Sequence, residues 1–124
     1  MIGATFDTGA LIALERRDVS MAIKLRVLHQ AGVPITIPAN AVAEWWRKGH
    51  GQTSILELGT VEPLTEEIAK AAGEALPKVR RSTLVDATVM ASAARRGDRV
   101  FTSDPSDMQK LQRHFRAVVD IVPV

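Results

Sequence analysis

The chain has 124 residues, 46% hydrophobic and 24% charged, with 16 Lys and Arg against 14 Asp and Glu. This composition predicts one soluble globular domain, residues 1–124, and the net charge of +2 permits a polyanionic partner without requiring one. The absence of cysteine excludes disulfides, zinc–thiolate sites and thiol nucleophiles. No apolar run approaches the roughly 18 residues of a membrane span, and the N-terminus does not resemble a signal peptide. We therefore expect a cytoplasmic protein that does not contact a membrane.

The apolar pattern of the first half predicts alternating strands and helices. The expected elements are a strand over 2–6, helices over 8–16 and 20–31, a strand over 34–37 and a helix over 39–48. Residues 50–59 are less regular and predict one helical stretch through Ile55 and Leu56. In the helix over 20–31, Ile23, Val27 and Leu28 are predicted to share one face.

The second half continues the alternation. Its expected elements are a strand around Val61, a helix over 65–76, a basic connection over 77–82, a helix over 83–96, a strand over 99–102, a helix over 104–113 and a strand over 118–122. Gly32, Gly49 and Gly97 follow predicted helices, where glycine favours termination. The alternation predicts an α/β fold with a mainly parallel sheet.

Four acidic residues fall where a solvated carboxylate is not expected. Asp7 and Asp104 follow predicted strands, and the carboxyl ends of parallel strands form the rim where ligands bind. Glu44 and Asp86 lie in helical segments with few polar neighbours, AVAEWW and LVDATVMA. We predict that the four carboxylates converge into one acidic pocket.

Asp86 gives the strongest reason to expect a bound cation. It shares one side of its helix with Val89, Met90 and Ala93, a side that should face the core. An unpaired buried carboxylate is costly, so it must be protonated, paired with a base or bound to a cation. No basic residue stands within a helical turn of it. Ligation by oxygen alone suits Mg²⁺ or Mn²⁺ rather than zinc.

Each of these acids also has a simpler explanation. Asp7 could cap the helix that follows it, and Asp104 with Asp107 three residues later resembles a capping arrangement. Glu44 could pair with the basic residues three and four positions later on its own helix. Asp86 could pair with an arginine from elsewhere in the chain.

Four segments carry a family resemblance. They are FDTGALIAL around Asp7, AVAEWWR around Glu44, LVDATVMASAARRGD around Asp86 and VFTSDPSDMQKL around Asp104. Together they resemble the PIN-domain ribonucleases, and most closely the VapC toxins of bacterial type II toxin–antitoxin pairs. The resemblance covers essentially the whole chain, in order and with suitable spacing.

The resemblance implies a PIN domain with a parallel five-stranded sheet in the order 3-2-1-4-5, flanked by helices. It implies that the four acids are the catalytic residues and the ligands of Mg²⁺ or Mn²⁺. Further positions match polar residues of such sites: Asp107 as an additional acid, and Thr8, Thr102 and Ser103 as groups that orient the carboxylates or a water.

The implied activity is hydrolysis of RNA phosphodiester bonds by metal-activated water. The implied partners are RNA, a cognate antitoxin and a second copy of the chain in a homodimer. Two alternatives stand beside it: a non-catalytic interaction module with the PIN fold, and an aspartyl-phosphate phosphotransfer enzyme using Asp7. Gly9 stands where the haloacid-dehalogenase type of the latter would have a second acid.

Basic residues and tryptophans supply secondary candidates. Those predicted to be available to an RNA backbone are Arg16, Arg17, Arg47, Lys48, Arg80, Arg81, Arg95, Arg96 and Arg99. Trp45 and Trp46 cannot both face the core from one helix, so one is predicted to pack and the other to serve an interface.

Overall fold

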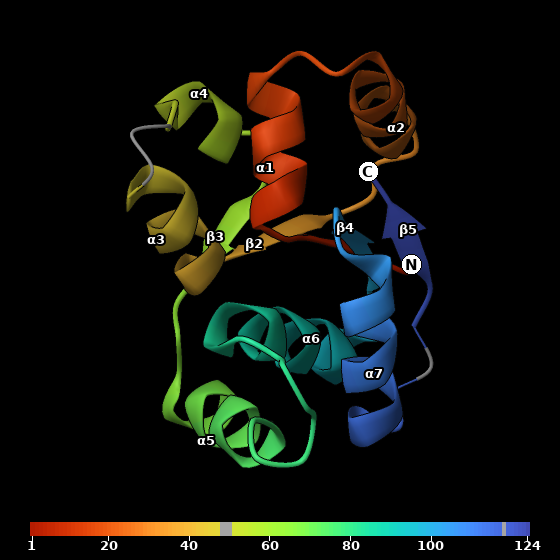
Figure 1. The fold of residues 1–124 in the computed structure, drawn as a ribbon. Helices are drawn as coiled ribbons and strands as arrows, with labels where there is room; N and C mark the ends of the chain where they lie inside the picture. The colour runs from red at the N-terminus through yellow and green to blue at the C-terminus, as the bar shows by residue number, and fades with distance from the viewer. Residues whose placement is uncertain (48–50, 118) are drawn as a thin grey trace.

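A five-stranded, wholly parallel sheet organises the molecule (Figure 1). The computed structural model describes residues 1–47, 51–117 and 119–124. Its strands are β1 (Ala4–Phe6), β2 (Ile35–Pro38), β3 (Thr60–Glu62), β4 (Arg99–Thr102) and β5 (Ile121–Pro123). They lie in the order β3-β2-β1-β4-β5, which confirms the predicted topology.

Helices cover both faces of this sheet. They are α1 (Thr8–Glu15), α2 (Val19–Gln30), α3 (Ala39–Arg47), α4 (Thr53–Leu56), α5 (Glu66–Ala75), α6 (Leu84–Arg96) and α7 (Pro105–Phe115). Figure 1 shows α1, α2 and α4 on one side of the sheet and α5, α6 and α7 on the other. None of the helices in the described residues is long and apolar enough to cross a membrane.

Local signals in the sequence explain where α6 begins and ends. The Thr83 side chain accepts a hydrogen bond from the Asp86 N–H at 3.1 Å, which caps the first turn. Gly97 adopts φ 72°, a left-handed conformation that glycine tolerates, and stops the helix as predicted. Residues 87–93 between these ends are all buried, so α6 is the central helix of the core.

The core joins the sheet to helices on both sides. Phe6 of β1 and Phe101 of β4 pack edge to face with ring centroids 5.3 Å apart. Trp45 of α3 is fully buried, whereas its neighbour Trp46 is 50% exposed. This split confirms that only one of the two tryptophans packs inside.

The core face of α2 was predicted wrongly. Leu28 is buried as expected, but Ile23 and Val27 are 56% and 58% exposed. Met21 is fully buried instead, in the first turn of a helix that Asp18 caps with its side chain. The helix carries two apolar stripes, and the periodicity of apolar residues cannot show which of them meets the core.

The last strand is shorter and starts later than predicted. α7 continues to Phe115, two residues beyond the expected end. The Gln112 side chain then donates to the carbonyls of Ala117 and Val119 at 3.2 and 2.6 Å. These bonds hold the connection against α7, so pairing with β4 begins only at Ile121. Val118, the predicted first residue of the strand, lies outside the described residues.

Candidate metal centre

Asp7 and Asp104 are brought together by the sheet. β1 and β4 are parallel neighbours with Phe6 opposite Phe101, so the residues after them meet at the same edge. Asp7 follows β1 and caps α1, and Asp104 follows β4 at the N-cap position of α7. The capping alternative is confirmed for Asp7, whose side chain accepts the Ala10 N–H, whereas Asp104 stands at the N-cap position without a side-chain capping bond. A capping position does not exclude a further role at this edge.

Three carboxylates form the tightest group in the described residues. Asp86, Asp104 and Asp107 each place one oxygen within 4.8 Å of the others. Asp7 is not within that distance of all three, but its charge, like those of Asp104 and Asp107, acts on Asp86. We call these four residues the acidic cluster. Asp107, a secondary candidate from the sequence, is thus one of its central members.

Burial and the neighbouring carboxyls raise the pKa values of Asp86 and Asp104. Burial, followed by the neighbouring charges of Asp7, Asp104 and Asp107, raises the pKa of Asp86 to about 6, against a hydrogen bond from Thr83 that lowers it. The pKa of Asp104 is raised chiefly by its hydrogen bond with the Asp107 carboxyl. The metal-free cluster therefore resists full ionisation.

Asp7 is held rigidly by donors. Its side chain is 4% exposed, and burial raises its pKa. Hydrogen bonds from the Thr102 hydroxyl and from the N–H groups of Ala10, Ser103 and Gly9 oppose that rise. The bond from Ala10 measures 2.8 Å. These donors fix the orientation of the carboxylate without supplying a formal positive charge.

Thr102 links two members of the cluster. Its hydroxyl donates to Asp7 and accepts the N–H of Asp104 at 2.9 Å. That Thr102 orients a carboxylate at a metal site stays a prediction. The hydroxyl of Thr8 points elsewhere and donates to the carbonyl of Ala41 at 3.5 Å, so it joins α1 to α3.

Glu44 stands apart from this geometry. It is partly buried on α3 and lines a hollow of about 270 Å³ together with Asn40, Arg47 and Leu84. It forms no ion pair with Arg47, and Lys48, its other predicted partner, lies outside the described residues. A shared role with the acidic cluster stays a prediction for Glu44.

The donor set fits a divalent cation. Within the described part of the chain, no Lys or Arg pairs with Asp7, Asp86 or Asp104, and the arginine considered for Asp86 is not found. Lys110 reaches Asp107 at 3.8 Å and offers only partial compensation. Hard oxygen ligands with uncompensated negative charge are what Mg²⁺ and Mn²⁺ prefer.

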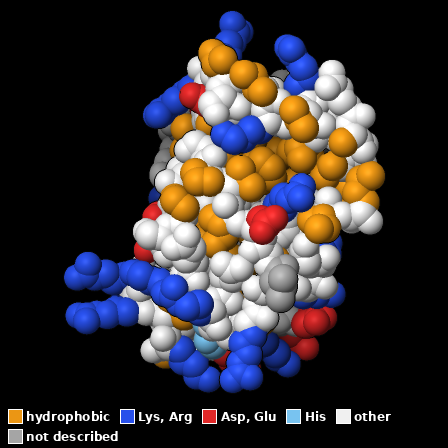
Figure 2. Space-filling model, turned by 90° about the vertical axis from the view of Figure 1, so that its right-hand side faces the viewer, with side chains coloured by type: hydrophobic (Ala, Val, Ile, Leu, Met, Phe, Trp, Pro, Cys, Tyr) orange, Lys and Arg blue, Asp and Glu red, His pale blue; other side chains and the backbone are white. Residues whose placement is uncertain are grey.

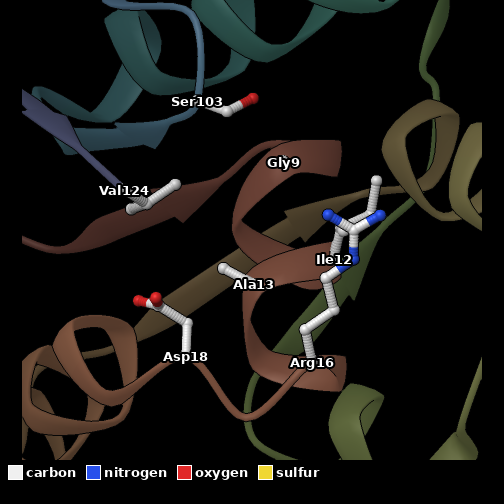
Figure 3. A pocket seen from close by; sticks show the side chains of 7 residues that line it. All are labelled: Gly9, Ile12, Ala13, Arg16, Asp18, Ser103 and Val124. Carbon is white, nitrogen blue, oxygen red and sulfur yellow. The ribbon is translucent and has the colours of Figure 1, made fainter.

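A hollow of about 420 Å³ opens along α1 (Figure 3). It is lined by Gly9, Ile12, Ala13, Arg16, Asp18, Ser103 and Val124. Two of these residues, Ser103 and Gly9, also donate backbone N–H groups to Asp7, although no carboxylate of the acidic cluster lines the hollow. A Cβ on Gly9 would come within 2.0 Å of the Ser103 Oγ, which explains why glycine occupies that position.

Three of the predicted RNA-binding arginines are engaged in internal contacts. Arg96 donates to Asp98 at 2.9 Å and also contacts Glu62, Ser92 and Thr5. Arg95 pairs with Glu67 at 3.5 Å and Arg99 with Asp120 at 3.4 Å. Arg96 in particular anchors α6 to the sheet, a role that the sequence analysis missed because none of its partners is adjacent in the chain.

Comparisons with known proteins agree with this architecture. The PIN domain family model matches residues 4–113, so the chain belongs to the PIN-domain family. A comparison with curated proteins finds no match.

Solved structures are similar over nearly the whole chain. DNA-bound VapBC from Salmonella typhimurium matches with a TM-score of 0.76 and 12% identity, covering 99% of this chain and 98% of that one. VapBC2 from Rickettsia felis, bound to a promoter DNA fragment, matches with a TM-score of 0.73 and 13% identity, covering 98% of each chain. A toxin–antitoxin complex from Klebsiella pneumoniae matches with a TM-score of 0.66 and 20% identity, covering 85% of this chain and 89% of that one. At these identities the likeness shows the fold, as the sequence resemblance implied.

Proposed function

We propose that this protein is a metal-dependent endoribonuclease and the toxin of a toxin–antitoxin pair. The observation that carries the proposal is the meeting of Asp86, Asp104 and Asp107 oxygens within 4.8 Å beside the buried Asp7. Membership of the PIN-domain family and the likeness to toxin–antitoxin complexes support it.

The surroundings of each carboxylate suggest its role in the proposed site. Asp86, Asp104 and Asp107 would hold Mg²⁺ or Mn²⁺, because their oxygens are close and no Lys or Arg of the described residues forms an ion pair with Asp86 or Asp104. Asp7 would complete the site from a fixed orientation, since four donors hold it. Glu44 would orient a water or ligate a second ion from α3.

A bound divalent cation would lower the pKa of a water and stabilise charge on the departing oxygen. The protein's own contribution is orientation. Thr102 fixes Asp7 and the backbone of Asp104 together, so the two strand ends cannot separate without losing both bonds. Lys110, 3.8 Å from Asp107, would offer a positive charge to a phosphate bound next to the cluster.

The two alternatives are less consistent with the site. An aspartyl-phosphate enzyme needs a nucleophilic carboxylate that is open to the phosphoryl donor, whereas Asp7 is 4% exposed and accepts several hydrogen bonds. A non-catalytic interaction module has no need for neighbouring carboxylates that raise the pKa values of Asp86 and Asp104.

An RNA cleavage assay with Mg²⁺ or Mn²⁺ tests the proposal. Wild type should cleave, and Asp7→Asn and Asp104→Asn should each lose at least about two orders of magnitude in rate. Asp120→Asn is the matched control, because Asp120 is an exposed carboxylate on the α7–β5 connection. Cleavage that persists in EDTA, or that survives both substitutions, would contradict the proposal. Phosphorylation of Asp7 by a phosphoryl donor would support the aspartyl-phosphate alternative instead.

We also propose that the antitoxin covers an exposed apolar face. Val19, Ile23 and Val27 follow at intervals of four along α2 and are 72%, 56% and 58% exposed, and Met1 and Ile2 are exposed as well. Figure 2 shows apolar side chains gathered over the upper half of this face. Ile23→Glu should abolish capture of the product of the adjacent gene while leaving RNA cleavage intact.

A homodimer is proposed on separate grounds. Trp46 is 50% exposed on α3 and Leu84 is 50% exposed at the start of α6, and both elements border the hollow that contains Glu44. Sedimentation of wild type against Trp46→Glu tests this, since a dimer held by this surface would become monomeric.

A further inference from the structure

A basic hollow lies beside the acidic cluster, between the α5–α6 connection and α7. Two adjoining cavities of about 330 and 390 Å³ share Arg80 and Lys110. The cationic or titratable side chains that line them are Lys78, Arg80, Arg81, Lys110, Arg113 and His114. Figure 2 shows Lys and Arg side chains gathered around a histidine over the lower part of the molecule.

The cations of the basic hollow are largely uncompensated. Among the side chains that the structure describes, the one ion pair made by these residues joins Lys110 to Asp107 at 3.8 Å. Lys110 and Asp107 are 47% and 29% exposed, so this pair is weak. Positive charges that gather without acidic partners raise the local concentration of anions and favour a polyanionic ligand.

Both walls of the basic hollow lead away from the acidic cluster. Asp107, Lys110 and Arg113 follow at intervals of three and share one face of α7. A rise of 1.5 Å per residue puts Arg113 about 9 Å from Asp107 along the helix axis. On the other wall, the connection that carries Arg81 runs into the first turn of α6, where Asp86 lies.

We propose that the basic hollow binds the phosphate backbone of an RNA strand on one side of the phosphate held at the acidic cluster. This rests on the proposed function and names the path of its substrate. A length of about 9 Å corresponds to roughly two to three stacked nucleotides. Contacts of this kind give affinity rather than sequence choice.

The lining favours RNA over an acidic polypeptide. Val79 is the single apolar side chain among the described residues that line the hollow. A bound polypeptide would need apolar surface for its own side chains, whereas a phosphate backbone needs spaced cations.

The backbone conformation of Arg81 allows its charge to be removed without straining the fold. Arg81 has φ 65°, a left-handed conformation that favours glycine, so Arg81→Gly removes the charge and relieves the backbone at once. Arg17, one of the basic residues that the sequence analysis considered for RNA, has φ 58° but lines neither cavity of the basic hollow, so Arg17→Gly is the matched control. Figure 1 shows the α1–α2 connection, which carries Arg17, and the α5–α6 connection at opposite ends of the molecule. Neither variant should lower the Tm.

Fluorescence anisotropy with a single-stranded RNA of about ten nucleotides measures binding. EDTA prevents cleavage, so the measurement does not depend on the nuclease activity. Arg81→Gly should weaken binding about five-fold near 0.1 M salt and reduce the slope of log K against log salt by about 0.7. Arg81→Gly combined with Arg113→Gln should weaken binding further, and Arg17→Gly should bind as wild type does.

Wild-type affinity in the Arg81→Gly protein, or an equal loss in Arg17→Gly, would overturn the proposal. A further control is poly-glutamate of the same charge as the RNA. If it binds as tightly as the RNA and loses affinity equally in Arg81→Gly, the proposal is overturned in favour of an acidic polypeptide. If Arg81→Gly weakens RNA binding but wild type does not cleave with Mg²⁺, the proposed activity fails and the binding path stands. If wild type cleaves and Arg81→Gly binds RNA as wild type does, the proposed activity stands and the binding path fails.

Discussion

Replacing Asp86 with asparagine should stabilise the metal-free protein at neutral pH. Burial and the charges of Asp7, Asp104 and Asp107 raise the pKa of Asp86 to about 6 from an ordinary 3.8. The folded protein therefore binds this proton more tightly than the unfolded chain does. The stability that the protonated Asp86 contributes is fully present below the pKa of Asp86 in the unfolded chain. It is lost as the pH rises towards 6, and above that pH the ionised carboxylate opposes folding. Asparagine carries no charge, so the variant avoids this loss.

The size of the effect follows from the shift. A shift from 3.8 to about 6 would correspond to about 3 kcal/mol for a wholly buried group. Solvent reaches part of the Asp86 side chain and screens it, which leaves about 1–2 kcal/mol. For a domain of 124 residues this is a rise in Tm of roughly 3–8 °C.

Thermal or urea unfolding in EDTA, at about pH 4 and about pH 7.5, measures the difference. Asp86→Asn should exceed wild type near neutral pH and approach it near pH 4, while the exposed-site control Asp120→Asn should match wild type at both. Millimolar Mg²⁺ should then stabilise wild type and not Asp86→Asn. A variant less stable than wild type near neutral pH in EDTA would refute the reasoning. Metal that shifts neither protein would refute the site.

Three further perturbations test the surroundings of the cluster. Gly9→Ala should lower the free energy of urea unfolding by about 1–3 kcal/mol, because its Cβ would come within 2.0 Å of the Ser103 hydroxyl oxygen. Adding Ser103→Gly in the same chain should restore much of that stability. If the effects of the two substitutions simply add, the contact is contradicted. Thr102→Val should weaken Mg²⁺ binding, measured by calorimetry, because Asp7 loses a donor and ionises less readily. It should also cost about 1–3 kcal/mol in urea unfolding, because the Asp104 N–H loses its acceptor. Unchanged Mg²⁺ affinity would contradict this role. Arg96→Met should lower the free energy of unfolding by about 3–5 kcal/mol, because it leaves the buried Asp98 without its cationic partner. Arg95→Met removes an exposed pair and should lower it by less than about 1 kcal/mol. Equal costs would contradict the internal role of Arg96.

The sequence predicted most of the fold because its signals are local. Thr83 and Gly97 bound α6 within a residue of the expected ends, and the alternation of strand and helix was enough for the parallel sheet. The α2 face was missed because two apolar stripes compete on that helix, and tertiary packing selects between them. The start of β5 was missed because Gln112, a side chain from the preceding helix, holds the connection.

The site was predicted less completely. Asp7, Asp86 and Asp104 could be selected from strand ends and an apolar helix face, and these rules gave no reason to rank Asp107 with them. A signal was present, since Asp107 lies three residues after Asp104 and thus on the same helix face. The spacing was interpreted as a cap, which it also resembles. Whether Glu44 joins the cluster depends on the placement of α3 against α6, which no local pattern determines.

Two buried carboxylates of the fold show why a cation is expected at one end of the sheet alone. Asp98 and Asp7 are each 4% exposed. Asp98 accepts hydrogen bonds from Arg96 and Thr5, both at 2.9 Å, so a guanidinium from the end of α6 neutralises it. Asp7 accepts bonds only from neutral donors among its known partners, and its neighbour Asp86 has no basic partner in the described chain. At Asp98 the guanidinium of Arg96 supplies the counter-charge. At the acidic cluster, where α1, α6 and α7 begin, the negative charge stays uncompensated. An imbalance at that place is costly in the metal-free state, and a divalent cation would remove the cost.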